Sequence, residues 1–151
     1  MTFECKIQNG EEKGVILFGL TSRHSKTAPG WDMGSVGYKV CESNGGFVYK
    51  DGKEYASAPI VKIGDVVGCR LRYSTTDDEF TAFCTFTKND EDVTKEIPMS
   101  TFDDLKFYPA VASSLSGLEL DVNITYNPYR LQYSWIYSVR IVSHVLMSSD
   151  S

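Results

Sequence analysis

The chain has 151 residues, a net charge of -5 at pH 7 and an aromatic content of 13%. A chain of this length forms one domain of ordinary size and buries roughly 70% of its unfolded surface. Lys and Arg are scattered singly along the sequence, which argues against a nucleic-acid binder because such proteins carry a basic stripe. The many Tyr, Phe, Thr and Val residues favour strands over helices.

The cysteines and apolar runs predict the compartment. Cys5, Cys41, Cys69 and Cys84 lack the spacing of a zinc site, and three of them occupy apolar strand positions, which favours reduced, buried thiols. The N-terminal sequence MTFECKIQNGEEKG lacks the apolar run of a signal peptide. The apolar-rich stretch Trp135–Met147 is interrupted by polar residues and too short to span a bilayer. We therefore expect a soluble cytoplasmic or nuclear protein in a reducing compartment, without membrane contact.

The first 20 residues predict two strands and a turn. Phe3, Cys5 and Ile7 alternate with polar residues, a pattern typical of a half-buried strand. Val15–Leu20 is apolar at both alternating positions, which indicates a central strand covered on both faces. The sequence of Asn9–Glu12, NGEE, is typical of a hairpin-like turn between them.

A long polar loop, Thr21–Gly37, comes next and contains one of the five prolines, Pro29, and three glycines suited to turns, Gly30, Gly34 and Gly37. Long ordered loops on a rigid scaffold often carry function. After a short strand at Tyr38–Cys41, the runs Phe47–Tyr49 and Glu54–Ala56 flank Lys50–Lys53, whose sequence KDGK predicts a tight hairpin turn.

The stretch Ile63–Asn89 gives the clearest alternation in the chain. Apolar side chains recur at every second position of Val67–Tyr73 and again of Phe80–Phe86, which predicts two long strands with one face in a core. The acidic sequence at Asp77–Glu79 joins them and is expected to be a solvated turn.

The C-terminal third predicts further strands and one ambiguous segment. Ser100–Asp104 has an N-cap residue followed by acidic residues, which favours a single helical turn. Phe107–Ala112 and the alternating Leu118–Ile124 predict strands. The tail, residues 134–151, fits a helix or a strand, with β-branched residues leaning toward a strand. It is expected either to pair with the strand at Phe3 or to lie over it as a helix.

Short strands recurring without a long helix predict an all-β sandwich or barrel, with at most one or two short helical turns. Segments of the chain then resemble, in order, the SPRY domain family, and best its Ran-binding-protein-like branch. They are Gly30–Tyr55, Ile63–Cys69, Phe86–Asp90, Phe107–Ser114 and Leu118–Ile124, with the opening strand, Gly14–Leu20 and Asn127–Tyr129 as weaker likenesses.

The resemblance covers residues 2–133 and implies a two-layer antiparallel β-sandwich of concanavalin-like shape. It implies a non-enzymatic module that binds a protein or short peptide through loops at one end, as an adaptor or as the substrate receptor of a ubiquitin ligase. The chain departs from the family pattern at both ends, because no strand precedes Phe3 and the last 18 residues match nothing in the family. We divide it into a SPRY-like domain, residues 1–133, and a tail, residues 134–151, and expect a monomer or part of a larger assembly.

Loop residues form the predicted partner-binding site: Arg23, His24, Trp31, Tyr49, Asp51, Ser114, Leu115 and Ser116. Trp31 is either an exposed anchor for a partner or a pin that packs under its own loop, and the second role is favoured because so long a loop needs a hydrophobic anchor. Arg23 and His24 either form a rim for an acidic peptide or are ordinary solvated residues.

The assignment of Tyr49 comes from the resemblance, because a Tyr in a similar Tyr-x-Asp-Gly segment lines the ligand pocket of peptide-binding family members. Its structural alternative is a cross-strand contact with Tyr55. Ser114–Ser116 lies in the loop that supplies the rest of that pocket. Family members often carry a Trp near the position of Leu115, and its absence argues against the same peptide motif.

Two other functional classes remain open. A lectin-like sandwich could stack sugars on Trp31, although secretion signals and disulfides would then be expected. Catalysis has little support, because His24 and His144 are far apart in sequence and lie in no nucleophile motif. The carboxylate clusters Asp77–Glu79 and Asp90–Asp92 lack the spacing of a calcium loop. We expect no metal, no cofactor and no enzymatic activity.

Overall fold

The chain forms strands throughout the part that its computed structural model describes, residues 1–9, 15–22, 28–40, 46–76, 79–99, 107–113, 118–126 and 135–143. No helix is present in these ranges. The strands are, in chain order, β1 (Thr2–Asn9), β2 (Ile16–Ser22), β3 (Val36–Val40), β4 (Gly46–Lys50), β5 (Lys53–Ala58), β6 (Val66–Thr76), β7 (Glu79–Lys88), β8 (Glu91–Asp92), β9 (Ile97–Pro98), β10 (Phe107–Ser113), β11 (Leu118–Tyr126) and β12 (Trp135–Ser143).

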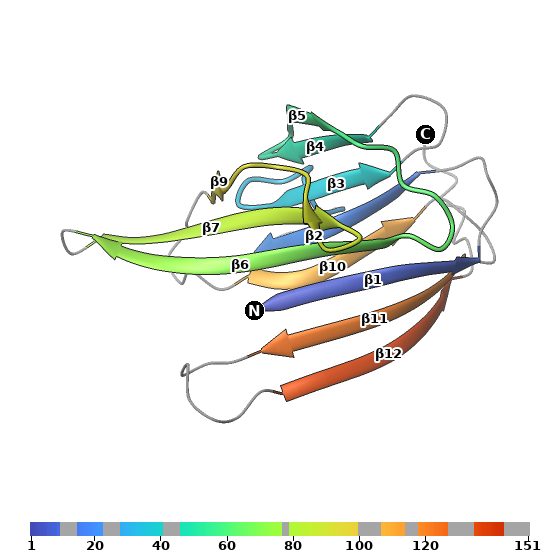
Figure 1. Cartoon of the computed structure of the whole chain (residues 1–151). Coiled ribbons are helices and arrows are strands. Elements are labelled where there is room, and N and C mark those ends of the chain that lie inside the picture. The colour runs from blue at the N-terminus through green and yellow to red at the C-terminus, as the bar shows by residue number, and fades with distance from the viewer. Residues whose placement is uncertain are drawn as a thin grey trace.

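The strands pair into two antiparallel sheets (Figure 1). Sheet A has the order β12-β11-β1-β6-β7-β8, with β9 also paired to β7. Sheet B has the order β10-β2-β3-β4-β5. The predicted all-β, two-layer antiparallel sandwich is confirmed. The predicted helical turn at Ser100–Asp104 lies outside the described residues.

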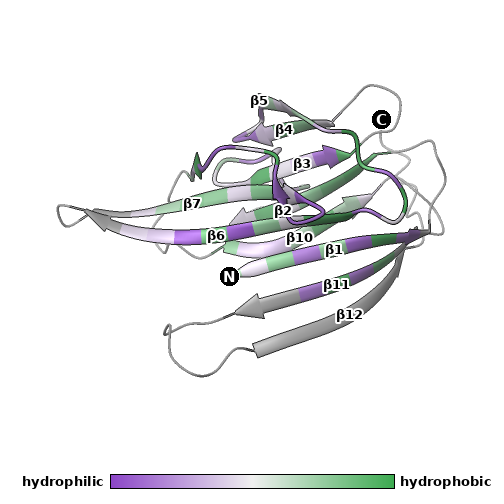
Figure 2. Cartoon of the chain, viewed as in Figure 1, coloured by the Kyte–Doolittle hydropathy of each residue, from purple (hydrophilic) through white to green (hydrophobic). Residues whose placement is uncertain are grey.

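The core lies between the two sheets and explains the alternation in the sequence. Hydrophobic and hydrophilic residues alternate along strands such as β1 and β6 (Figure 2). Phe3 on sheet A stacks on Phe18 on sheet B with ring centroids 4.4 Å apart. Phe86 on sheet A lies 6.3 Å from Phe18 and 5.8 Å from Tyr38. These rings join the sheets at the centre, since burying aromatic area is a large part of core stability.

Two strong sequence predictions are confirmed at the level of elements. The stretch Ile63–Asn89 forms β6 and β7, which pair from Val67 with Lys88 to Thr76 with Glu79. Their far end extends beyond the neighbouring strands (Figure 1). β2, predicted as a central strand, lies between β10 and β3 and is buried from Ile16 to Leu20.

Two predictions about strand partners are wrong. The turn after Asn9 does not make a hairpin, because β1 lies in sheet A between β11 and β6, whereas β2 lies in sheet B. The described part of the tail is a strand, as its β-branched content favours, but β12 pairs with β11 and not with the strand at Phe3. Turn residues predict only that the chain reverses direction. Which strands then pair depends on contacts between residues that are distant in sequence. The division at residue 133 stays a prediction.

The thiols behave as small core residues, as predicted for three of the four. Cys5, Cys69 and Cys84 are free and buried, whereas Cys41 lies outside the described residues. Cys69 and Cys84 lie on neighbouring strands with their Sγ atoms 3.1 Å apart. Burial raises the pKa of Cys5 to about 12 and raises that of Cys84 well above its ordinary value. These groups are therefore neutral thiols at physiological pH.

Candidate functional site

The described end of the β2–β3 loop, residues 28–35, lies on the outer face of sheet B, the face turned away from sheet A. Gly37 and Tyr49 are directly paired on this face, since the intervening residues Tyr38 and Val48 point into the core. A Cβ atom added at Gly37 would meet the carbonyl oxygen of Pro29 at 2.2 Å. The loop backbone therefore lies directly against the β3 backbone, a close approach that only glycine permits.

Ser35 fixes the shape of this loop from inside. Its side chain is fully buried, and its Oγ accepts the N–H groups of Gly30 at 2.9 Å and Asp32 at 3.2 Å. The same hydroxyl donates to the carbonyl oxygen of Asp32 at 2.7 Å. One buried hydroxyl thus binds three backbone groups of the turn, and it is the acceptor for two of them, the N–H groups of Gly30 and Asp32.

The β4–β5 turn binds the loop from the side. Gly52 N–H donates to Gly30 C=O at 2.8 Å, and Asp51 N–H donates to Ser35 C=O at 3.1 Å. Asp51 adopts φ 52°, and its Oδ1 accepts the N–H of Gly34 at 2.7 Å. The turn predicted from KDGK is confirmed, and the Asp51 carboxylate holds two loops together. A direct role of Asp51 in partner binding stays a prediction.

Trp31 and Tyr49 meet on this scaffold and form an aromatic pair at the surface. Their ring centroids are 5.0 Å apart at an interplanar angle of 33°. Trp31 remains 45% exposed, and Met33 beside it is 58% exposed. The ring of Trp31 therefore packs on its own protein and still presents area to solvent, and its role as an anchor for a partner stays a prediction.

The contact proposed between Tyr49 and Tyr55 as the structural alternative is not formed by direct strand pairing. A register shift after Val48 pairs Tyr49 with Glu54 instead. The ammonium group of Lys50 lies 5.7 Å from the ring centroid of Tyr55.

The structure brings three residues of the predicted site together in one cluster: Trp31, Tyr49 and Asp51. The other predicted residues lie outside the described ranges: Arg23, His24, Ser114, Leu115 and Ser116. Sequence reasoning did not identify Ser35, Gly37 or Lys39 as parts of the candidate site. The Nζ of Lys39 lies 5.8 Å from the ring centroid of Tyr49. Its position, two residues from Gly37 on the same face of β3, was a usable signal once the strand was recognised.

Charged groups on the opposite layer form surface ion pairs. Arg72 donates to both carboxylate oxygens of Glu96, at 2.7 and 2.8 Å, and these hydrogen bonds lower the pKa of Glu96. Arg70 donates a hydrogen bond to one carboxylate oxygen of Asp92, also on the exposed surface. Such exposed pairs add little stability. Among the described residues, no group of three His, Cys, Asp or Glu side chains is arranged to hold a metal ion. No helix in this part of the chain is long and apolar enough to cross a membrane.

Comparisons with known proteins agree on one family. The SPRY domain family matches residues 1–127. A Drosophila melanogaster protein described as a Ran-binding proteins 9/10 homolog is 30% identical over 153 aligned residues, which cover 98% of this chain and 14% of that protein. The crystal structure of a human SPRY domain is similar, with a TM-score of 0.59 and 26% identity over 80% of this chain and 74% of that one. The chain therefore spans only a small part of the Drosophila relative's length.

Proposed function

Because the chain belongs to the SPRY domain family, whose members are in general non-enzymatic protein-interaction modules, we propose that it binds a short segment of a partner protein on the outer face of sheet B. The binding surface is built around Trp31 and Tyr49. Arg23, His24 and Ser114–Ser116, which lie outside the described residues, stay predicted contributors to partner binding.

One observation carries the proposal: an exposed aromatic side chain is held on a rigid loop. Trp31 keeps 45% of its surface exposed although its ring packs against Tyr49. The backbone on either side is fixed by Ser35 and by the β4–β5 turn. An anchor that is ordered before binding loses little conformational entropy on binding, and Trp and Tyr are enriched among residues that dominate binding energy.

We propose the role in the cell from the family resemblance: the domain acts as the partner-recognition part of an adaptor or of the substrate receptor of a ubiquitin ligase. The matched region is a small part of the Drosophila protein, which supports a place within a larger protein. Three buried free thiols support a reducing compartment, the cytoplasm or nucleus.

The test is a quantitative pull-down from the native cell with the variants Trp31→Ala, Tyr49→Ala and Leu115→Ala. Each truncation is expected to weaken capture of a common partner set by about 5- to 150-fold, equivalent to about 1–3 kcal/mol. Tyr73→Ala is the matched control, because Tyr73 is a comparably exposed aromatic residue (42%) on sheet A. Unchanged capture by all three variants, at an unchanged melting temperature, would remove the site assignment.

A further inference from the structure

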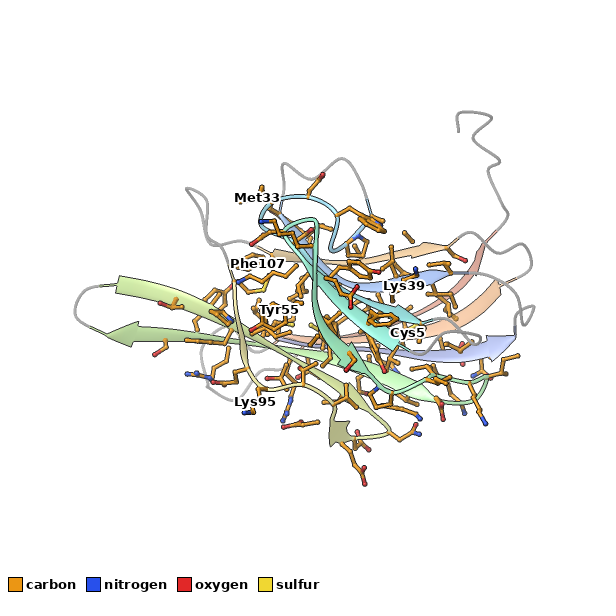
Figure 3. The ribbon with its side chains drawn as sticks, turned by 90° about the horizontal axis from the view of Figure 1, so that it is seen from above. Cys5, Met33, Lys39, Tyr55, Lys95 and Phe107 are labelled. Carbon is orange, nitrogen blue, oxygen red and sulfur yellow. The ribbon has the colours of Figure 1, made fainter. Side chains whose placement is uncertain are left out.

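Lys39 places a positive charge beside the aromatic pair. It lies on β3, directly paired with Phe47 on β4 and Leu17 on β2, and all three face outward from sheet B. Its ammonium group lies 5.8 Å from the ring centroid of Tyr49 (Figure 3 labels Lys39 on this layer). Leu17 is buried although it faces away from the core. A long lysine stem can cover an apolar neighbour while its charge stays at the surface.

The charge of Lys39 has no carboxylate partner among the described residues. The ion pairs of this part of the chain are all formed elsewhere: Arg70–Asp92, Arg72–Glu96 and Lys88–Asp65. The carboxylate of Asp51, in the turn beside the aromatic pair, already accepts the N–H of Gly34. An ammonium group held over a half-buried ring and left unpaired can accept a carboxylate from a partner.

Glu54 supplies the opposite charge on the other side of Tyr49. It is the direct cross-strand partner of Tyr49 on β5, is exposed, and forms no ion pair within the described ranges. Strands lie about 4.8 Å apart, and same-face residues along a strand about 6.8 Å apart, so Lys39 and Glu54 are separated by roughly 12 Å. An extended peptide crosses this separation in about four residues, at about 3.3 Å each, and side chains four positions apart point to the same side of such a peptide.

We infer that the partner segment is an extended peptide with an acidic side chain that pairs with Lys39, an apolar side chain that packs on Trp31 and Tyr49, and a basic side chain four positions from the acidic one that pairs with Glu54. This inference rests on the proposed function and specifies which peptide the surface accepts. The charges act mainly on specificity and on the rate of association, and their effect weakens at high salt.

The experiment selects a random 12-residue peptide library, displayed on phage, against the whole chain and its variants. The wild-type protein is expected to enrich peptides with acidic and basic residues four positions apart around an apolar one. Lys39→Glu is expected to bind these peptides about 10-fold more weakly and to regain affinity when the acidic residue of the peptide is replaced by Lys. Lys39→Met keeps the stem and removes only the charge, so it separates loss of charge from loss of packing.

The controls distinguish two kinds of failure. Lys95→Glu makes the same change of charge at an exposed lysine that Figure 3 places on the side of sheet A, away from Lys39, and it should leave selection unchanged. Peptides that depend on Tyr49 but show no acidic preference, or no rescue by charge exchange, would overturn the inference and leave the proposed function standing. If no selected peptide loses binding with Tyr49→Ala, both fail.

Discussion

Replacing Ser35 by Ala is expected to destabilise the protein more than any other single serine truncation in the described chain. The substitution leaves the buried Gly30 N–H and the partly buried Asp32 N–H without their acceptor. An orphaned buried donor costs about 1–3 kcal/mol. Because the Asp32 N–H lies closer to solvent, we expect a total loss of about 2 kcal/mol in the free energy of unfolding. For a chain of this length that loss lowers the melting temperature by about 4–8 °C.

Ser22 provides a matched control within the same fold. Its Oγ is also buried but has no hydrogen-bond partner among the described residues. Ser22→Ala therefore removes an unsatisfied polar atom and should be neutral or stabilising by up to about 1 kcal/mol. Urea unfolding followed by tryptophan fluorescence measures both variants, with the m-value as a check that the denatured state is unchanged. The reasoning is wrong if Ser35→Ala unfolds at the wild-type urea concentration, or if both variants lose equal stability.

Three further predictions test other contacts. Gly37→Ala should cost more than about 2 kcal/mol of stability in the same assay and reduce partner capture, because its Cβ would lie 2.2 Å from the Pro29 carbonyl oxygen and push the loop away. The pKa of Asp65 is lowered: partial burial raises it, but hydrogen bonds from Asn89 and a backbone N–H outweigh that effect. The ionised Asp65 carboxylate therefore adds to the free energy of unfolding above about pH 4, and this contribution is lost as pH falls through the native pKa. The stability difference between wild type and Asp65→Asn should accordingly shrink below pH 4. Cys84 should resist iodoacetamide in the native state and react fully in urea, as mass spectrometry would detect; rapid native labelling would contradict its burial.

The fold was largely predictable because strands are local patterns. Alternating apolar residues mark β6 and β7, and the Asp51–Gly52 pair marks the β4–β5 turn, since both signals arise from a few neighbouring residues. The order of the strands within the two sheets could not be predicted from any single short segment of the sequence. β1 and β2 are close in sequence yet belong to different sheets, and β12 pairs with β11. Nothing within a single segment specifies either outcome.

The candidate site was predictable only in part, for the same reason. Tyr49 and Asp51 were identified through a short motif at a turn. The contact between Trp31 and Tyr49 joins the β2–β3 loop to β4, and it depends on the pairing of Gly37 with Tyr49 and on the close approach of Pro29 to Gly37, which no local pattern predicts. No local sequence pattern distinguishes Lys39 from other surface lysines, because the feature that sets it apart is the Tyr49 ring beside it.

The backbone contact between Pro29 and Gly37 has a consequence for how this surface can change during evolution or in the laboratory. The loop is held mainly by main-chain groups, by Ser35 and by the Asp51 carboxylate, and its exposed side chains contribute little to that support. Positions such as Trp31, Met33 and Lys39 are therefore open to substitution without loss of the loop's shape. A library that randomises those positions and preserves Ser35, Gly37 and Asp51 should yield folded domains with new partners, whereas variation at the preserved positions should yield less stable domains with a displaced loop.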